Sequence, residues 1–257
     1  MNIFLYKDIT KILKNVKKIT CNFPYSSIII VKKINRLTYK EWSFVLMKSV
    51  KIPEVAVSRL SVYSRFLTQV EKSGGVRISS GEIAAGTGGT PAQVRKDLAY
   101  FGEFGTRGVG YNVAELNKEI CNILGIGKKW RVILVGAGNL GSALTQYAGF
   151  KSRGFDIEAV FDNDLNKVGL RLNDTPVMAI NRIYDYVVEN KIDIAIIAVP
   201  DKHAQDIADL LVTSGIKGIL NFAPVTLNIP EDVQVRNVDL AVNLEILSFN
   251  IVVNNKE

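Results

Sequence analysis

A run of four apolar residues, Val132 to Val135, leads directly into a glycine-rich sequence. The run is typical of a buried parallel strand, and the first glycine allows a tight turn out of that strand. The second glycine lets a pyrophosphate approach the backbone, and the third lets the next helix pack closely on the strand, with its N-terminus toward the anion. The predicted dinucleotide-binding loop consists of Gly136, Ala137, Gly138, Asn139, Leu140 and Gly141.

An acidic residue, Asp162, ends the next apolar run about 20 residues further on. Its carboxylate can accept hydrogen bonds from a ribose 2′-hydroxyl and would repel a 2′-phosphate, so we predict NAD⁺ or NADH rather than NADP(H) as the ligand. Three glycines in a loop can also mark turns alone. The buried strand before the loop and the acid after it favour the dinucleotide interpretation.

Two further apolar runs, residues 193–200 and 218–224, are separated by a predicted helix over residues 204–214. Strands alternating with helices predict a doubly wound α/β unit with a parallel sheet. Ligands of such sheets bind beyond the carboxyl ends of the strands, which places Pro200 and Phe222 near the glycine-rich loop. Phe222 either covers the nicotinamide or is a core aromatic residue.

The segment before this unit carries the signals of a helix-turn-helix. A helix is predicted from Pro53 to Gly74, followed by a capping box at residues 79–82 and a glycine-containing turn. A second capping box, Thr90 with Gln93, has proline at the first helical position and begins the second short helix.

On this second helix Val94, Leu98 and Phe101 share one face and would pack on the first long helix. The opposite face combines small residues with cations, which suits a helix in the major groove of DNA, although any surface helix has a solvated face. Residues 102–111 then show the glycine spacing of a two-stranded wing with Arg107 at its tip. The predicted DNA-binding residues are Gln93, Arg95, Lys96, Tyr100 and Arg107.

The chain of 257 residues has a net charge of +7, and residues 1–50 alone carry +8, so the overall basicity does not by itself indicate nucleic acid. The two cysteines, Cys21 and Cys121, indicate neither a disulfide framework nor a metal site. No apolar run reaches the length of a membrane span and no convincing secretory signal is present, so we expect a cytoplasmic protein that does not enter the membrane.

We divide the chain into five segments: a basic extension over residues 1–50, a winged helix over 51–112, a linker helix and loop over 113–129, a Rossmann unit over 130–242, and a C-terminal helix over 243–257. The last helix is strongly apolar for a chain end. It must therefore be buried, and a partner subunit is one place where it can be.

A winged helix before an NAD-type Rossmann unit resembles the redox-sensing transcriptional repressor Rex family. The most specific stretches are residues 94–98, 100–111 and 215–224. The resemblance implies a homodimer that exchanges its C-terminal helices, binds pseudo-palindromic operator DNA in the apo or NAD⁺ form, and releases it when NADH binds. It also implies a switch network between the units, formed by Arg65, Tyr147 and Asp239. Residues 1 to about 46 have no counterpart in the family pattern. They are either a genuine basic arm or the result of a start codon placed too early, and we expect the second.

Two other classes remain open: an NAD-dependent dehydrogenase and a Rossmann module that binds coenzyme A. Hydride transfer usually needs an acid or base near the nicotinamide, and the single histidine, His203, lies at a helix start that is typical of a solvated residue. We therefore expect a binding protein rather than an enzyme.

Overall fold

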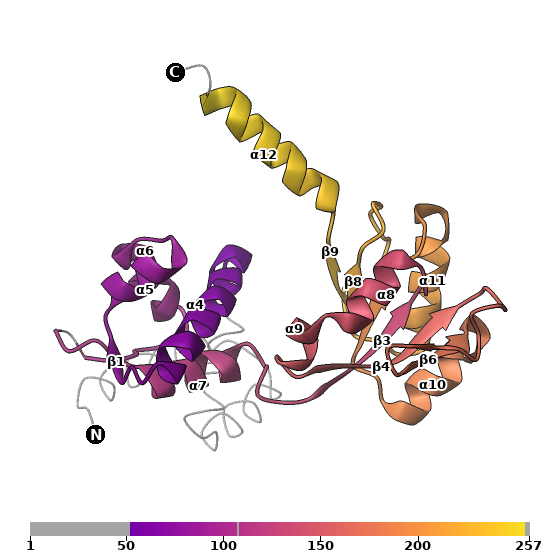
Figure 1. Cartoon of the computed structure of the whole chain (residues 1–257), viewed down its shortest axis with the longest axis horizontal. Coiled ribbons are helices and arrows are strands. Elements are labelled where there is room, and N and C mark those ends of the chain that lie inside the picture. Colours follow the sequence, from indigo (N-terminus) through magenta and orange to yellow (C-terminus); the bar gives the residue numbers. More distant parts are fainter. Residues whose placement is uncertain (1–51, 107, 255–257) are drawn as a thin grey trace, which may run out of the picture. The chain divides into compact units, whose positions relative to one another are not determined.

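A computed structural model of the chain describes residues 52–106 and 108–254 (Figure 1). It divides into two compact units, and the boundary falls between Leu124 and Gly125. The predictions for residues 1–50 and for Arg107 lie outside the described residues.

The first unit combines four helices with a two-stranded ribbon in its described part. Strand β1 pairs antiparallel with β2, and Ile78 lies opposite Tyr111. Beyond this pair, Thr106 and Gly110 exchange backbone hydrogen bonds and form the base of the wing tip. The elements are α4 (Glu54–Lys72), β1 (Arg77–Ile78), α5 (Ser80–Thr87), α6 (Pro91–Ala99), β2 (Tyr111–Asn112) and α7 (Val113–Ile123).

The capping residues explain where α5 and α6 begin. The Ser79 hydroxyl accepts a hydrogen bond from the backbone N–H of Glu82, and the Glu82 carboxylate accepts one from the N–H of Ser79, which confirms the first capping box. Thr90 caps α6 by accepting from the N–H of Gln93. The second capping box is wrong, because the Gln93 side chain donates to Asp97 instead of returning to the backbone of Thr90.

Helix α7, which the sequence assigned to a linker, packs into the core of the first unit. Val113, Leu116 and Ile120 are buried together with Leu60 and Leu67 of α4. Their three- and four-residue spacing gives α7 an apolar face, and burial of that face is favourable. Along the chain, the loop after Leu124 connects the two units.

The second unit is a seven-stranded sheet with the order β5-β6-β4-β3-β7-β8-β9. All neighbouring strands are parallel except β5 and β6. From β6 to β9 this is the strand order of a dinucleotide-binding Rossmann sheet, with its switch point between β3 and β7. The strands are β3 (Trp130–Val135), β4 (Phe155–Asp162), β5 (Arg171–Leu172), β6 (Thr175–Ala179), β7 (Ile194–Ile197), β8 (Gly218–Asn221) and β9 (Gln234–Asn237).

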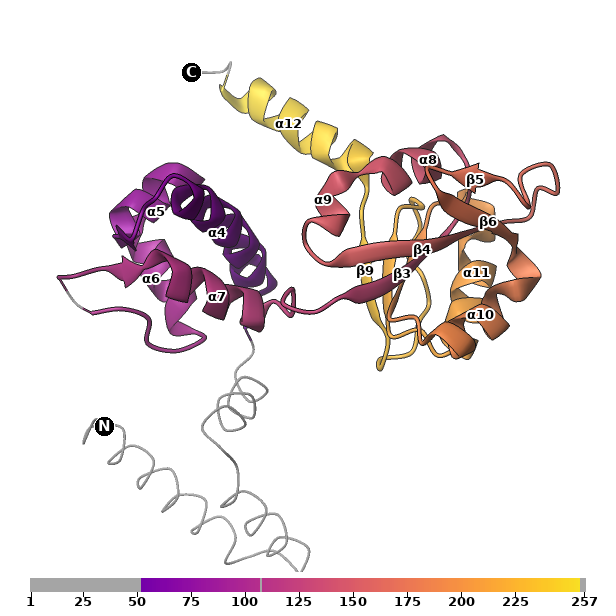
Figure 2. The same ribbon diagram turned by 60° about the horizontal axis from the view of Figure 1, so that its bottom comes forward.

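Helices cover both faces of this sheet (Figure 2). Ile133 and Val135 of β3 join the core cluster that contains residues of α10 and α11, whereas Val132 and Leu134 join the cluster against α8 and α9. The alternation follows from the two-residue period of a strand and explains why β3 is apolar throughout. The helices are α8 (Asn139–Gln146), α9 (Ala148–Lys151), α10 (Ile183–Asn190), preceded by the 3₁₀ turn Ile180–Arg182, and α11 (Asp201–Thr213).

The C-terminal helix α12 (Leu240–Asn254) begins earlier than predicted, because Asp239 caps it by accepting hydrogen bonds from the N–H groups of Ala241 and Val242. None of its described side chains is buried, and apolar residues such as Leu244 and Phe249 are 68% and 65% exposed. Among the described residues, no helix has the length and apolar character that crossing a bilayer requires.

Candidate functional site

The glycine-rich loop lies between β3 and α8 at the switch point of the sheet. Gly136 has φ of +108°, and a side chain there would collide with the backbone oxygen of Ala198. A side chain at Gly141 would collide with the backbone oxygen of Gly136, so α8 approaches the loop as closely as the third glycine of the motif permits.

Gly138 differs from these two glycines. A methyl group added at Gly138 would meet no other protein atom within 4 Å, and its φ of −83° is open to any residue. Neither packing nor backbone strain in the protein therefore requires a glycine here. The close approach of a pyrophosphate to the backbone would require one, so the loop fits a dinucleotide.

Asp162 ends β4 and is only 7% exposed. Its Oδ2 accepts a 2.6 Å hydrogen bond from the backbone N–H of Ala137, and its Oδ1 accepts one of 2.8 Å from the N–H of Asp164. Burial opposes ionisation, but these two bonds and the Lys167 ammonium, 3.5 Å from Oδ2, outweigh burial and hold the pKa of Asp162 below its ordinary value. Asp162, which the sequence predicts to bind the ribose, therefore also braces the glycine-rich loop.

A pocket of about 540 Å³ opens beyond the carboxyl ends of β3, β4 and β7. Four of the predicted cofactor residues line it: Gly136, Gly138, Asp162 and Pro200. Ala137, Asn139, Leu140 and Gly141 belong to the loop and the first turn of α8 without lining the pocket. Further lining residues are not part of the sequence motif, although most of them follow strand ends: Asn163, Asp164, Lys167, Ile180, Ala198, Val199, Lys202, Asp206 and Ile207.

Phe222 is not among the residues that line this pocket. It is partly buried against the cluster that contains Val132 and Leu134, which supports its alternative interpretation as a core aromatic residue. His203 lies in the first turn of α11, is exposed, and does line the pocket.

In the first unit, Val94 and Leu98 of α6 are buried, whereas Arg95 and Lys96 are exposed and Tyr100 is half-buried at the C-cap. The exposed face is therefore the one on which the sequence places the DNA contacts. Arg95 donates a 2.8 Å hydrogen bond to the hydroxyl of Ser80, and the two residues border a groove of about 740 Å³ that continues along the wing.

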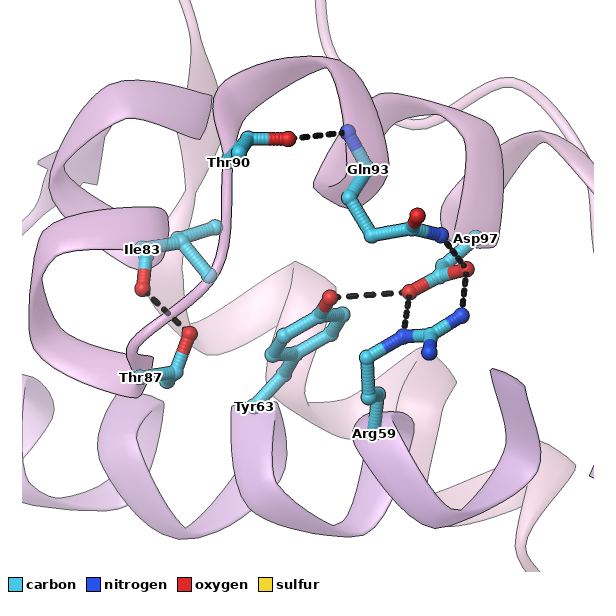
Figure 3. A network of polar contacts seen from close by, with 7 residues as sticks. All are labelled: Arg59, Tyr63, Ile83, Thr87, Thr90, Gln93 and Asp97. Carbon is cyan, nitrogen blue, oxygen red and sulfur yellow. Dashed lines mark hydrogen bonds and ion pairs between the residues drawn. The ribbon is translucent and has the colours of Figure 1, made fainter. Parts of the chain in front are cut away.

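A buried carboxylate that is absent from the predicted site residues connects α6 to α4 (Figure 3). The side chain of Asp97 is fully buried and accepts hydrogen bonds from Arg59 Nε at 2.5 Å and Nη2 at 2.8 Å, and from the Tyr63 hydroxyl at 2.8 Å. The Nε2 of Gln93 donates a fourth bond, of 2.7 Å. The sequence does contain one signal for Asp97: it lies three residues after Val94, on the core side of the helix.

The charge of this network follows from its bonds. Burial opposes ionisation of Asp97, but the hydrogen bonds from Arg59, Tyr63 and Gln93 outweigh burial and keep the pKa of Asp97 below its ordinary value. Burial, together with the hydrogen bond to Asp97, raises the pKa of Tyr63 to about 12. The network therefore holds an ionised carboxylate and a neutral phenol at neutral pH.

The three predicted switch residues lie in different elements. Arg65 is exposed on α4 of the first unit. Tyr147, between α8 and α9, is 54% exposed and packs edge-on against Phe150, with ring centroids 5.0 Å apart. Asp239 caps α12. Their joint role in a switch stays a prediction.

A winged helix-turn-helix joined to a Rossmann unit with an open switch-point pocket defines a class of protein: a DNA-binding regulator that responds to a nucleotide. The family model described as "Putative DNA-binding protein N-terminus" matches residues 51–99, and the one described as "CoA binding domain" matches residues 127–225.

Comparison with known proteins gives the particular family. The chain is 57% identical over 210 residues to the redox-sensing transcriptional repressor Rex of Desulforamulus reducens, covering 82% of this chain and 100% of the relative. It is 58% identical over 205 residues to the Rex of Desulfitobacterium hafniense, covering 80% of this chain and 98% of the relative. The chain belongs to the Rex family of redox-sensing transcriptional repressors.

Solved structures support the same family assignment. The crystal structure of RSP in complex with β-NAD⁺ and operator DNA is similar with 39% identity and a TM-score of 0.76, covering 80% of this chain and 95% of that one. The structure of RSP with β-NADH is similar with 38% identity and a TM-score of 0.72, covering 80% and 97%. The dehydrogenase and coenzyme A alternatives are not favoured, because the repressors match across both units whereas the coenzyme A model matches the Rossmann unit alone.

Proposed function

We propose that this protein represses transcription by binding operator DNA through α6 and the wing, and that NADH in the switch-point pocket releases it from the DNA. The observation that carries the proposal is the presence, in one chain, of a dinucleotide loop braced by Asp162 and a helix with an exposed Arg95–Lys96 face. The Rex-family repressor RSP was crystallised with NAD⁺ and operator DNA and, separately, with NADH, which supports both ligands.

The chain's own residues suggest how the ligand is held. The N-terminus of α8 and the open backbone at Gly138 would take the pyrophosphate, and the acidic groups after β4 would take the adenosine ribose. NAD⁺ and NADH share these groups and differ at the nicotinamide, whose ring is positive when oxidised and neutral when reduced. A ligand shifts a conformational equilibrium only through its different affinity for the two states, so the redox response must arise at the nicotinamide end of the pocket.

The protein acts as a homodimer in this proposal. The supporting observation is α12, whose described apolar side chains are exposed in the single chain and need a partner to cover them. A two-fold dimer presents two α6 helices to two half-sites of a pseudo-palindromic operator, separated by about one turn of the duplex or a multiple of it. Closure around NADH would change the separation of the two helices and break this match.

The experiment is a titration of fluorescently labelled operator DNA with the full-length protein at fixed salt, alone, with NAD⁺ and with NADH. The proposal expects tight binding alone and with NAD⁺, and much weaker binding with NADH. Equal weakening by the two nucleotides would contradict it.

A further inference from the structure

Gln93 is the third residue of α6, and the role that we infer for it rests on the proposed function. Gln93 is half-buried near the N-terminal end of α6, the part of a recognition helix that contacts base edges. Its backbone N–H is already used by the Thr90 cap, and its side chain lies along the same helix toward Asp97, four residues on.

The amide of Gln93 can take only one orientation against Asp97. An ionised carboxylate accepts hydrogen bonds and donates none, so only the NH₂ end of the amide can face it. The Nε2 atom lies 2.7 Å from Asp97 Oδ1, and Arg59 and Tyr63 hold that carboxylate in place from α4. A rotation of the amide by 180° would bring two oxygen acceptors together.

The opposite end of the amide is then the carbonyl oxygen. Figure 3 shows this oxygen pointing away from Asp97, and no hydrogen bond to it occurs among the residues that the structure describes. One hydrogen of Nε2 is used by Asp97, and the amide keeps its second hydrogen as a donor. Gln93 therefore presents one acceptor and one donor side by side, in a fixed order.

We propose that Gln93 is a specificity-determining residue that reads a base with an exocyclic amino group in the major groove, adenine in particular. Adenine offers the matching pair, since its N6 amino group donates and its N7 accepts, and a glutamine amide can bind both. Guanine and thymine present acceptors where Gln93 presents its oxygen, so they are disfavoured. Asp97 acts as a positioning residue, because it sets the direction of the amide without contacting DNA.

The test uses the full-length dimer and a randomised double-stranded DNA library, from which bound sequences are enriched and read. The wild type is compared with Gln93→Met, which keeps the length of the side chain and removes the amide. Gln69→Met is the matched control, since Gln69 is an exposed glutamine on α4 of the same unit. Circular dichroism of each variant confirms that it is folded.

We expect the wild type and Gln69→Met to select the same site, with adenine at one position of each half-site. In Gln93→Met the discrimination at that position falls by roughly tenfold or more, the value of a good bidentate contact, while the other positions are retained. In Asp97→Asn, if it folds, the amide is free to turn, and guanine or thymine becomes accepted at the same position.

Three results would overturn the inference. The first is an unchanged consensus in Gln93→Met, and the second is a uniform loss of affinity with no change of consensus, which would make Gln93 a purely structural residue. The third is that the position at which Gln93→Met loses discrimination carries guanine or thymine in the site selected by the wild type. In each case the repressor function itself stands. A wild type that enriches no site at all would instead overturn the proposed function, and this inference with it.

Discussion

The carboxylate of Asp162 accepts a 2.6 Å hydrogen bond from the backbone N–H of Ala137, so the end of β4 holds the glycine-rich loop that follows β3. The sequence motif assigns this acid to the ribose of the cofactor. In the structure it first fixes the loop on which the pyrophosphate would rest. The predicted ribose contact and the geometry of the loop therefore depend on the same side chain.

Replacing Asp162 with asparagine tests this dependence. The amide keeps one acceptor and turns a donor toward Ala137 or Asp164, leaving a buried N–H without a partner, which costs about 1–3 kcal/mol. We expect the Kd for NADH to rise roughly tenfold or more, measured by isothermal titration calorimetry. Asp156→Asn is the control, since Asp156 is at the other end of β4 and pairs with the exposed Lys129. Equal NADH affinity in both variants would contradict this account.

Substitutions at Gly138 and Gly141 should have different effects, one on NADH binding and the other on folding. Gly138→Ala adds a methyl group that meets no protein atom, so we expect an unchanged melting temperature and a strongly weakened NADH affinity. Gly141→Ala collides with the backbone of Gly136, so we expect loss of the folded second unit. Thermal unfolding followed by circular dichroism, with NADH titration of the folded variants, distinguishes the two. Full NADH affinity in Gly138→Ala would show that no phosphate approaches this backbone.

How much of this site follows from sequence depends on how local its interactions are. The loop and Asp162 belong to one strand-turn-helix pattern and the strand beside it, so their spacing predicts them. The spacing from Val94 places Asp97 on the core side of its helix, but the sequence does not show that its partner is Arg59, which lies 38 residues earlier. For Phe222 the sequence places the residue near a strand end, but the packing of the sheet decides that it joins the core. The assignment of α7 to a linker is wrong for the same reason, because only its tertiary contact with α4 shows that it belongs to the first unit.

Removing Asp97 should destabilise the first unit more than a surface charge does. Asp97→Ala leaves Arg59 partly buried without its carboxylate and creates a small cavity, and breaking such a pair costs about 3 kcal/mol. We expect the midpoint of urea unfolding, followed by near-ultraviolet circular dichroism, to fall clearly. Glu119→Ala on the exposed side of α7 should change it little. Equal midpoints would mean that the network does not hold α6 on α4.

The raised pKa of Tyr63 predicts an alkaline limit to stability. The folded-state pKa of about 12 lies above the ordinary value of 10, so folding favours the neutral phenol. The stabilisation is fully present below pH 10 and is lost as the pH rises from 10 toward 12. We expect the free energy of unfolding of the wild type to decline over this range more steeply than that of Tyr63→Phe. Identical slopes would contradict the buried phenol.

The central claim is that the pocket and the DNA-binding face bias one equilibrium. Coupling between two binding sites is reciprocal, so operator DNA must weaken NADH binding by the same factor by which NADH weakens DNA binding. The direct measurement is the Kd for NADH, determined with the full-length dimer alone and again with saturating operator DNA at the same salt. The account predicts a higher Kd on DNA, by a factor equal to that found in the DNA titration, and no comparable change for NAD⁺. The same NADH Kd in both conditions would contradict it.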